Sequence, residues 1–169
     1  VLEAKVAPGS KQPVVVDFNI PQTMVLFGTQ GLRRNDPDYF SAYVMNQILG
    51  GEGGGLTSKL GVEIREKRGL AYTTYTFLQP LKHGAIWNGG FSTRNEQASA
   101  ALDVALSVLS DFAKNGPSVK ELEDAKRYLT GSFVLNLDSN TSIARFLINM
   151  QSARLWMDYL DRRNTMLTS

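Results

Sequence analysis

Residues 48–72 read ILGGEGGGLTSKLGVEIREKRGLAY and contain the glycine-marked turns that decide the fold. A helical pattern ends at Gly50, a glycine run follows, and a second helical pattern covers roughly Thr57 to Lys67. Gly69 ends that helix, and Tyr72 begins a stretch rich in Thr and aromatic residues, which is typical of a strand. The sequence therefore predicts two helices and a strand joined by short turns.

Two alternating patterns and a helix precede this stretch. Val14 to Phe18 and Met24 to Gly28 each alternate in hydropathy, with Pro21 as a break between them, so we predict two strands. Asp36-Pro37 predicts a helix start, because Asp can cap the first turn and proline suits the first helical position. The apolar residues that follow repeat at helical spacing until Gly50.

A hairpin is predicted directly after the stretch. Tyr72 to Leu78 and Ala85 to Phe91 both have strand composition, and Pro80, His83 and Gly84 lie in the turn region between them. We therefore expect an antiparallel pair, with His83 as a surface turn residue.

The remainder of the chain has helical patterns. An apolar stripe runs from Ala98 to Phe112, and Ser118 with Glu121 forms a capping box for the next helix. A break at residues 138–140 precedes a further helix, and residues 158–169 predict a short last one. The order β-β-α-α-β-β-α-α-α predicts an α+β fold, with a mainly antiparallel sheet and helices packed on one face.

Bulk composition narrows the class of protein. The 169 residues suit one domain spanning 1–169, and the chain begins with Val1, so we expect a fragment of a longer protein. A net charge of +2 without a basic segment does not favour nucleic-acid binding. Apolar runs fall well short of the ~20 residues that span a bilayer, so no membrane span is expected.

The residue inventory excludes most catalytic centres. There is one histidine and no cysteine, whereas a catalytic zinc needs about three protein ligands. Neither H-E-x-x-H nor its reverse occurs, and the G-x-S-x-G nucleophile motif is missing. We therefore predict no metal ligands on this chain.

The glycine run admits three interpretations. Phosphate binding is disfavoured, because the run joins two helices and Thr57-Ser58-Lys59 does not supply the Gly-Lys-Ser/Thr order of a Walker loop. A mobile connection between helices is the plain alternative. The third interpretation is that backbone without side chains lets a peptide approach closely.

Arg65 and Tyr72 flank the predicted turn between helix and strand. Guanidinium and phenol groups are both donors, and together they could polarise a peptide carbonyl or stabilise its oxyanion. The alternative is structural: Arg65, Lys67 and Arg68 favour the helix C-terminus electrostatically, and Tyr72 is a strand aromatic.

The ordered string from Ile48 to Tyr72 resembles the C-terminal-domain signature of pitrilysin-type zinc peptidases, the family of insulinase and the mitochondrial processing peptidase. The segment from Glu121 to Phe133 is also similar to that domain. The resemblance extends from about Pro21 to Met150. Its glycine motif alone is weakly specific, whereas the whole ordered string is strongly specific.

This resemblance implies a protein built from similar α+β halves, one of which carries H-x-x-E-H and a further Glu as a zinc site. The other half carries an Arg and a Tyr seven residues apart, and Arg65 and Tyr72 match that spacing. In the family this pair is thought to bind substrate backbone and assist the transition state. The family's glycine-rich loop is linked to substrate recognition, which implies that role for Gly53, Gly54 and Gly55.

The resemblance thus leads us to expect the non-catalytic half of a zinc metallopeptidase, which binds extended peptide and is inactive alone. Zinc is expected in a partner half, in the same chain or a separate subunit, with no cofactor on this chain. A dimer is also expected, since small bacterial members of the family often divide zinc binding and substrate binding between two chains. A periplasmic location is expected because many of these members are exported to the periplasm. Two alternatives stay open: an inactive scaffold subunit, and a stand-alone peptide-binding module.

Overall fold

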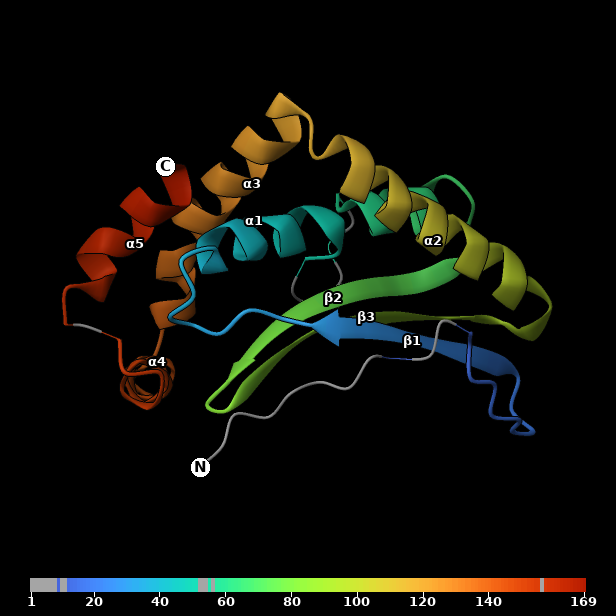
Figure 1. The fold of residues 1–169 in the computed structure, drawn as a ribbon, viewed down its shortest axis with the longest axis horizontal. Helices are drawn as coiled ribbons and strands as arrows, with labels where there is room; N and C mark the ends of the chain where they lie inside the picture. The colour runs from blue at the N-terminus through green and yellow to red at the C-terminus, as the bar shows by residue number, and fades with distance from the viewer. Residues whose placement is uncertain (1–8, 10–11, 52–54, 56, 156) are drawn as a thin grey trace.

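An antiparallel sheet carries the helices on one of its faces (Figure 1). The computed structural model describes residues 9, 12–51, 55, 57–155 and 157–169. Among these, the strands are β1 (Gln22–Gln30), β2 (Ala71–Leu81) and β3 (Gly84–Arg94), in the sheet order β1-β3-β2. The predicted α+β fold, with an antiparallel sheet and helices on one face, is confirmed.

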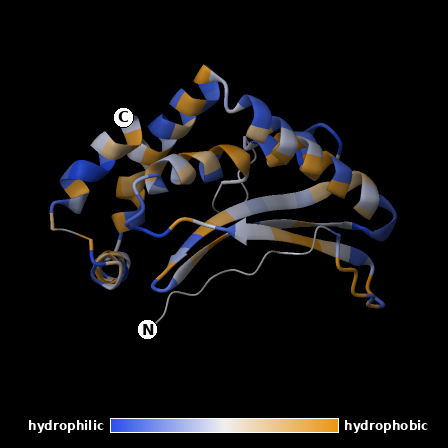
Figure 2. Cartoon of the chain, in the orientation of Figure 1, coloured by the Kyte–Doolittle hydropathy of each residue, from blue (hydrophilic) through white to orange (hydrophobic). Residues whose placement is uncertain are grey.

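The strand predicted at Val14 to Phe18 is wrong. These residues have no strand structure, and the side chains of Val14, Val16 and Phe18 are exposed. Figure 2 shows the apolar stretch before β1, and Figure 1 shows it turned away from the helices. Alternation alone predicted a strand, but a strand also needs a neighbour, and β1 pairs with β3.

The hairpin prediction is confirmed. β2 and β3 pair from Leu81 opposite Gly84, so that Lys82 and His83 form the connecting turn. β1 then pairs with the other side of β3, with Gln22 opposite Arg94. This register brings the start of β1 to the end of β3, although the two residues are far apart in sequence.

The helices follow the predicted order, with two short additions. α1 covers Tyr39–Leu49, α2 covers Ala98–Asn115 and α3 covers Val119–Gly131. α4 covers Asn140–Ser152 and α5 covers Tyr159–Thr168. Within the predicted second helix, Gly61–Glu66 form a π-helix, η1. The additions are two 3-10 segments, η2 (Asn95–Gln97) and η3 (Ser132–Leu137). No helix in the described parts of the chain is long and apolar enough to cross a membrane.

Two caps were predicted, and one is confirmed. At α3 the Ser118 hydroxyl accepts from the Glu121 amide, and the Glu121 carboxylate accepts from the Ser118 amide. At α1 the N-cap is Asp38, without a side-chain bond. Asp36 instead accepts a hydrogen bond from the Asp38 amide, 3.0 Å away, so it forms a turn before the helix rather than its cap.

Two buried clusters hold the helices in place. The first lies between the sheet, η1 and α2 and includes Ile64, Ala71 and Phe91. The second joins α1, α3 and α5 through Val44, Ile48, Ala125, Leu129 and Leu167. The first cluster fixes the junction between η1 and β2, where the predicted site residues lie.

The two faces of β1 differ sharply. Val25 and Phe27 pack against the first buried cluster. Met24 and Leu26 point to the other face and are 66% and 67% exposed. The described residues therefore leave the sheet's second face open.

Candidate functional site at the end of the sheet

The corner between η1 and β2 has a wider helical turn than the sequence predicts. We predicted one helix over Thr57 to Lys67, whereas residues 61–66 form a π-helix and the Lys67 amide donates to the Val62 carbonyl, 2.9 Å away. Short π-helical segments are rare and occur frequently at functional sites. Helix periodicity in the sequence does not distinguish them from α-helix.

Gly69 closes this corner. Its φ is +60°, a conformation that glycine adopts without steric cost. The Gly69 amide donates to the Arg65 carbonyl and the Leu70 amide donates to the Ile64 carbonyl, both at 2.9 Å. The bonds resemble a glycine C-cap widened by the π-turn, and they turn the chain directly into β2.

The structure brings Arg65 and Tyr72 together. The Arg65 guanidinium carbon lies 4.8 Å from the centre of the Tyr72 ring, within the range of a cation–π contact. The Tyr72 residue is 81% exposed and the Arg65 side chain 32% exposed. Both groups therefore remain accessible to a molecule that approaches this corner.

The other charges of the corner are paired with one another. The Glu63 carboxylate contacts Lys67 Nζ and Arg68 Nη1, each at 2.5 Å. These hydrogen bonds, from Lys67 first and then Arg68, hold the pKa of Glu63 below its usual value. Arg65 has a looser contact, with its Nε 3.5 Å from Glu66. The positive charge of Arg65 is therefore less neutralised than the charges of Lys67 and Arg68.

The glycine loop is described in part. Gly53 and Gly54 lie outside the described residues. Gly55 donates its amide to the Gly50 carbonyl at 3.2 Å, and its carbonyl accepts from the Ser58 hydroxyl at 2.6 Å. Gly55 thus anchors the end of the loop, and its predicted part in substrate binding stays a prediction.

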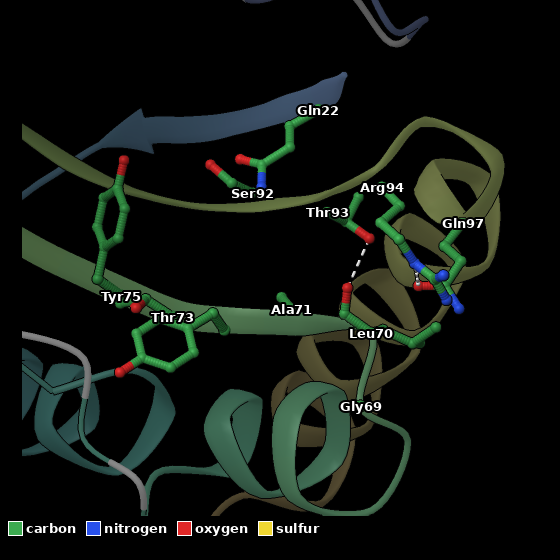
Figure 3. Close-up of a pocket in the computed structure, with 11 residues that line it drawn as sticks. Gln22, Gly69, Leu70, Ala71, Thr73, Tyr75, Ser92, Thr93, Arg94 and Gln97 are labelled. Carbon is green, nitrogen blue, oxygen red and sulfur yellow. Dashed lines mark hydrogen bonds between the residues drawn. The ribbon is translucent and has the colours of Figure 1, made fainter.

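A pocket of about 540 Å³ lies beside Tyr72, where β1 and β2 begin and β3 ends (Figure 3). Register in β2 shifts between Ala71 and Thr74, so Tyr72 and Thr73 stand out of the regular ladder. Figure 3 shows Gln22 close to Ser92, and Arg94 beside Gln97. The polar lining residues are Gln22, Tyr72, Thr73, Tyr75, Ser92, Thr93, Arg94 and Gln97.

Sequence reasoning named Tyr72 as a candidate site residue, but it predicted no pocket here and named no other residue of the pocket lining as a site residue. Gln22 and Arg94 are directly opposite in the β1–β3 register, and Gln97 follows in the next turn. No local motif in the sequence signals this pairing. Arg65 contacts Tyr72 from outside the pocket lining.

The described residues do not fit a metal ion. They contain no group of three or more His, Cys, Asp or Glu side chains placed to hold one. His83, the single histidine of the sequence, lies in the β2–β3 turn. The chemistry available at the corner is hydrogen-bond donation by guanidinium and phenol groups.

Sequence comparisons with known proteins match most of the chain. Residues 3–129 match the family model described as the peptidase M16 inactive domain. An uncharacterized zinc protease from Streptomyces coelicolor is 32% identical over 72% of this chain and 26% of its own length. A Helicobacter pylori protein named as a non-peptidase homolog is 29% identical over 78% of the chain and 30% of its own.

Solved structures show the same fold. The peptidase M16 inactive domain from Pseudomonas fluorescens superimposes with a TM-score of 0.78 and 36% identity. The match covers 89% of this chain and 34% of the other. This chain thus spans about a quarter to a third of the length of these proteins.

Proposed function

This chain belongs to the peptidase M16 inactive-domain family, whose model matches most of its length, and we propose that it serves as the zinc-free half of a zinc peptidase. In this role it binds an extended peptide and assists hydrolysis at a zinc site in another domain or subunit. The observation that carries the proposal is the exposed contact between Arg65 and Tyr72.

The corner suits a peptide carbonyl because it presents two kinds of donor on one surface. The Tyr72 hydroxyl and the Arg65 guanidinium both donate hydrogen bonds. Donors fixed before the reaction stabilise the charge that develops on a carbonyl oxygen without a reorganisation cost. The buried Ile64 and Ala71 fix the backbone that carries the two side chains.

The open pocket supports the binding half of the proposal. It adjoins Tyr72, and β2 is an edge strand among the described residues. An extended peptide that lies along this end of the sheet can place one carbonyl at Tyr72 and a neighbouring side chain in the pocket.

A second candidate is an inactive scaffold subunit. The Helicobacter pylori relative, named as a non-peptidase homolog, supports this alternative. A scaffold uses neither donor in catalysis, so replacing Arg65 or Tyr72 would leave the activity of the assembly unchanged.

The deciding experiment measures peptide hydrolysis by the full-length protein with its zinc-bearing half. Arg65→Ala and Tyr72→Phe are each compared with Arg127→Ala and Tyr128→Phe, which change exposed residues on α3. We expect kcat/KM to fall roughly 100-fold or more in the corner variants, as on loss of an oxyanion donor. Equal activity in corner and α3 variants would support the scaffold instead.

A further inference from the structure

The pocket beside Tyr72 carries a positive charge in its lining. Arg94 is the one charged residue among those lining it, and the others are polar or apolar without a carboxylate. Both ionic and hydrogen-bonding contacts of the Arg94 guanidinium use Nε, which lies 3.4 Å from Glu96 and 3.3 Å from Gln97. Within the described part of the chain, its two terminal nitrogens are therefore left for another acceptor.

The contact with Glu96 is easily displaced. The side chains of Arg94 and Glu96 are 66% and 67% exposed, and ion pairs at such sites contribute little because water screens them. Gln97 holds the Nε side of the guanidinium from within the pocket lining. A planar guanidinium fixed on one edge can bind a carboxylate through the other edge with two parallel hydrogen bonds.

Neutral donors complete the pocket. The amide of Gln22 and the hydroxyls of Thr73 and Ser92 line it together with Arg94. The hydroxyl proton of Thr93 is already used, because this hydroxyl donates a hydrogen bond to the Leu70 carbonyl at 2.6 Å. Tyr72 connects the pocket to the second guanidinium, since its ring contacts Arg65. One guanidinium thus lies in the pocket lining and a second contacts a lining residue, and the described residues that line the pocket include no acidic group.

We propose that this pocket binds a carboxylate of the peptide and that Arg94 is the residue that selects it. The carboxylate comes either from an Asp or Glu side chain or from the C-terminus of the peptide. The inference rests on the proposed function, because it assigns a preference to the peptide held at Tyr72. It predicts that peptides with a carboxylate near that carbonyl bind more tightly than their neutral counterparts.

The test measures equilibrium binding of three probe peptides to the full-length protein with its zinc-bearing half. The first is a short alanine-glycine peptide, acetylated and amidated, with one central Asp. The second has Asn in place of Asp, and the third is the Asn peptide with a free C-terminal carboxylate. We expect about 10-fold tighter binding for the carboxylate that fits, because a charge-assisted hydrogen bond is lost in the neutral peptide. The difference should shrink as salt is added.

Arg94→Gln should remove this preference, and Arg127→Gln, at an exposed position on α3, should retain it. Glu96→Gln should strengthen carboxylate binding, since it removes the competing acceptor. Tighter binding of the third probe alone would identify the C-terminus as the source. Equal affinity of all three probes for the native protein, or equal loss in the Arg94 and Arg127 variants, would overturn the inference.

Hydrolysis of the same peptides separates this inference from the proposed function. Suppose that Tyr72→Phe lowers kcat while Arg94→Gln leaves the ratio of affinities for the Asp and Asn peptides unchanged. The carboxylate pocket is then wrong and the proposed function stands. If Arg94→Gln removes the preference for the carboxylate peptide, but replacing Arg65 or Tyr72 leaves hydrolysis unchanged, the carboxylate pocket stands and the proposed function is wrong.

Discussion

Nζ of Lys59 lies 2.8 Å from Oε1 of Glu121, and this ion pair joins the residues before η1 to the first turn of α3. Glu121 also closes the capping box with Ser118. Burial raises the pKa of Glu121, but the hydrogen bonds from Lys59 and Ser118 outweigh that effect and leave the pKa below its usual value. One carboxylate therefore serves both the cap and the contact between two elements.

Replacing Glu121 by Gln should lower the free energy of unfolding by about 1 kcal/mol at neutral pH, because a Gln amide can still close the capping box but loses the ion pair with Lys59 and the negative charge at the helix N-terminus. Because the folded-state pKa is lowered, this stabilisation is present above the unfolded pKa of 4.5 and is lost as pH falls through the folded value. Thermal unfolding of both proteins across pH 7 to about pH 2 measures it. A stability difference that stays constant over this range would contradict the prediction.

Arg163 is a buried cation that donates to a backbone carbonyl as well as to the Asn164 side chain. It is 5% exposed, its Nη2 donates to the Leu129 carbonyl at 3.0 Å, and its guanidinium carbon lies 4.2 Å from the Phe133 ring centre. Arg163→Met should cost about 2 kcal/mol, because a buried carbonyl near the end of α3 loses its donor. Urea unfolding measures the loss. The neighbouring Arg162→Met removes an exposed pair with Asp158 and should cost less than about 0.5 kcal/mol.

Gly50 packs directly against β2. A Cβ at this position would lie 2.5 Å from Thr76 Oγ1 and 2.6 Å from the Thr76 amide nitrogen. Gly50→Ala should therefore destabilise the protein by about 2 kcal/mol through overpacking. Gly131 at the end of α3 has no atom within 4 Å of an added Cβ, so Gly131→Ala should stabilise by about 0.5 kcal/mol. Opposite shifts in Tm are expected, and two shifts of the same sign would contradict the packing argument.

The sequence predicted those parts of the fold that depend on local patterns. Pairing of β2 with β3 follows from one short turn, and the Ser118–Glu121 box from residues three apart, so both were accessible. Val14 to Phe18 has the alternation of a strand but no neighbour in the sheet. The π-helix η1 carries Ile64 into the first buried cluster, and local periodicity in the sequence does not distinguish a π-helix from an α-helix.

The candidate site divides in the same way. Arg65 and Tyr72 are linked by one corner, so their proximity was predictable from sequence. Arg94 reaches the pocket beside Tyr72 through the pairing of β3 with β2, in which Thr93 lies opposite Ala71, and this pairing joins residues far apart in sequence. The catalytic role of the pair, the periplasmic location and the dimer stay predictions.

The corner at Gly69 also has a mechanical consequence. Ile64 and Ala71, the neighbours of Arg65 and Tyr72 in sequence, belong to one buried cluster, and the turn between them is closed by its own amides. Any tilt of this chain against another domain would carry the guanidinium and the phenol as a single rigid body. Under the proposed function, their mutual orientation would be set locally and their distance from a scissile bond by the seating of the zinc-bearing half, so separate mutations would alter the two.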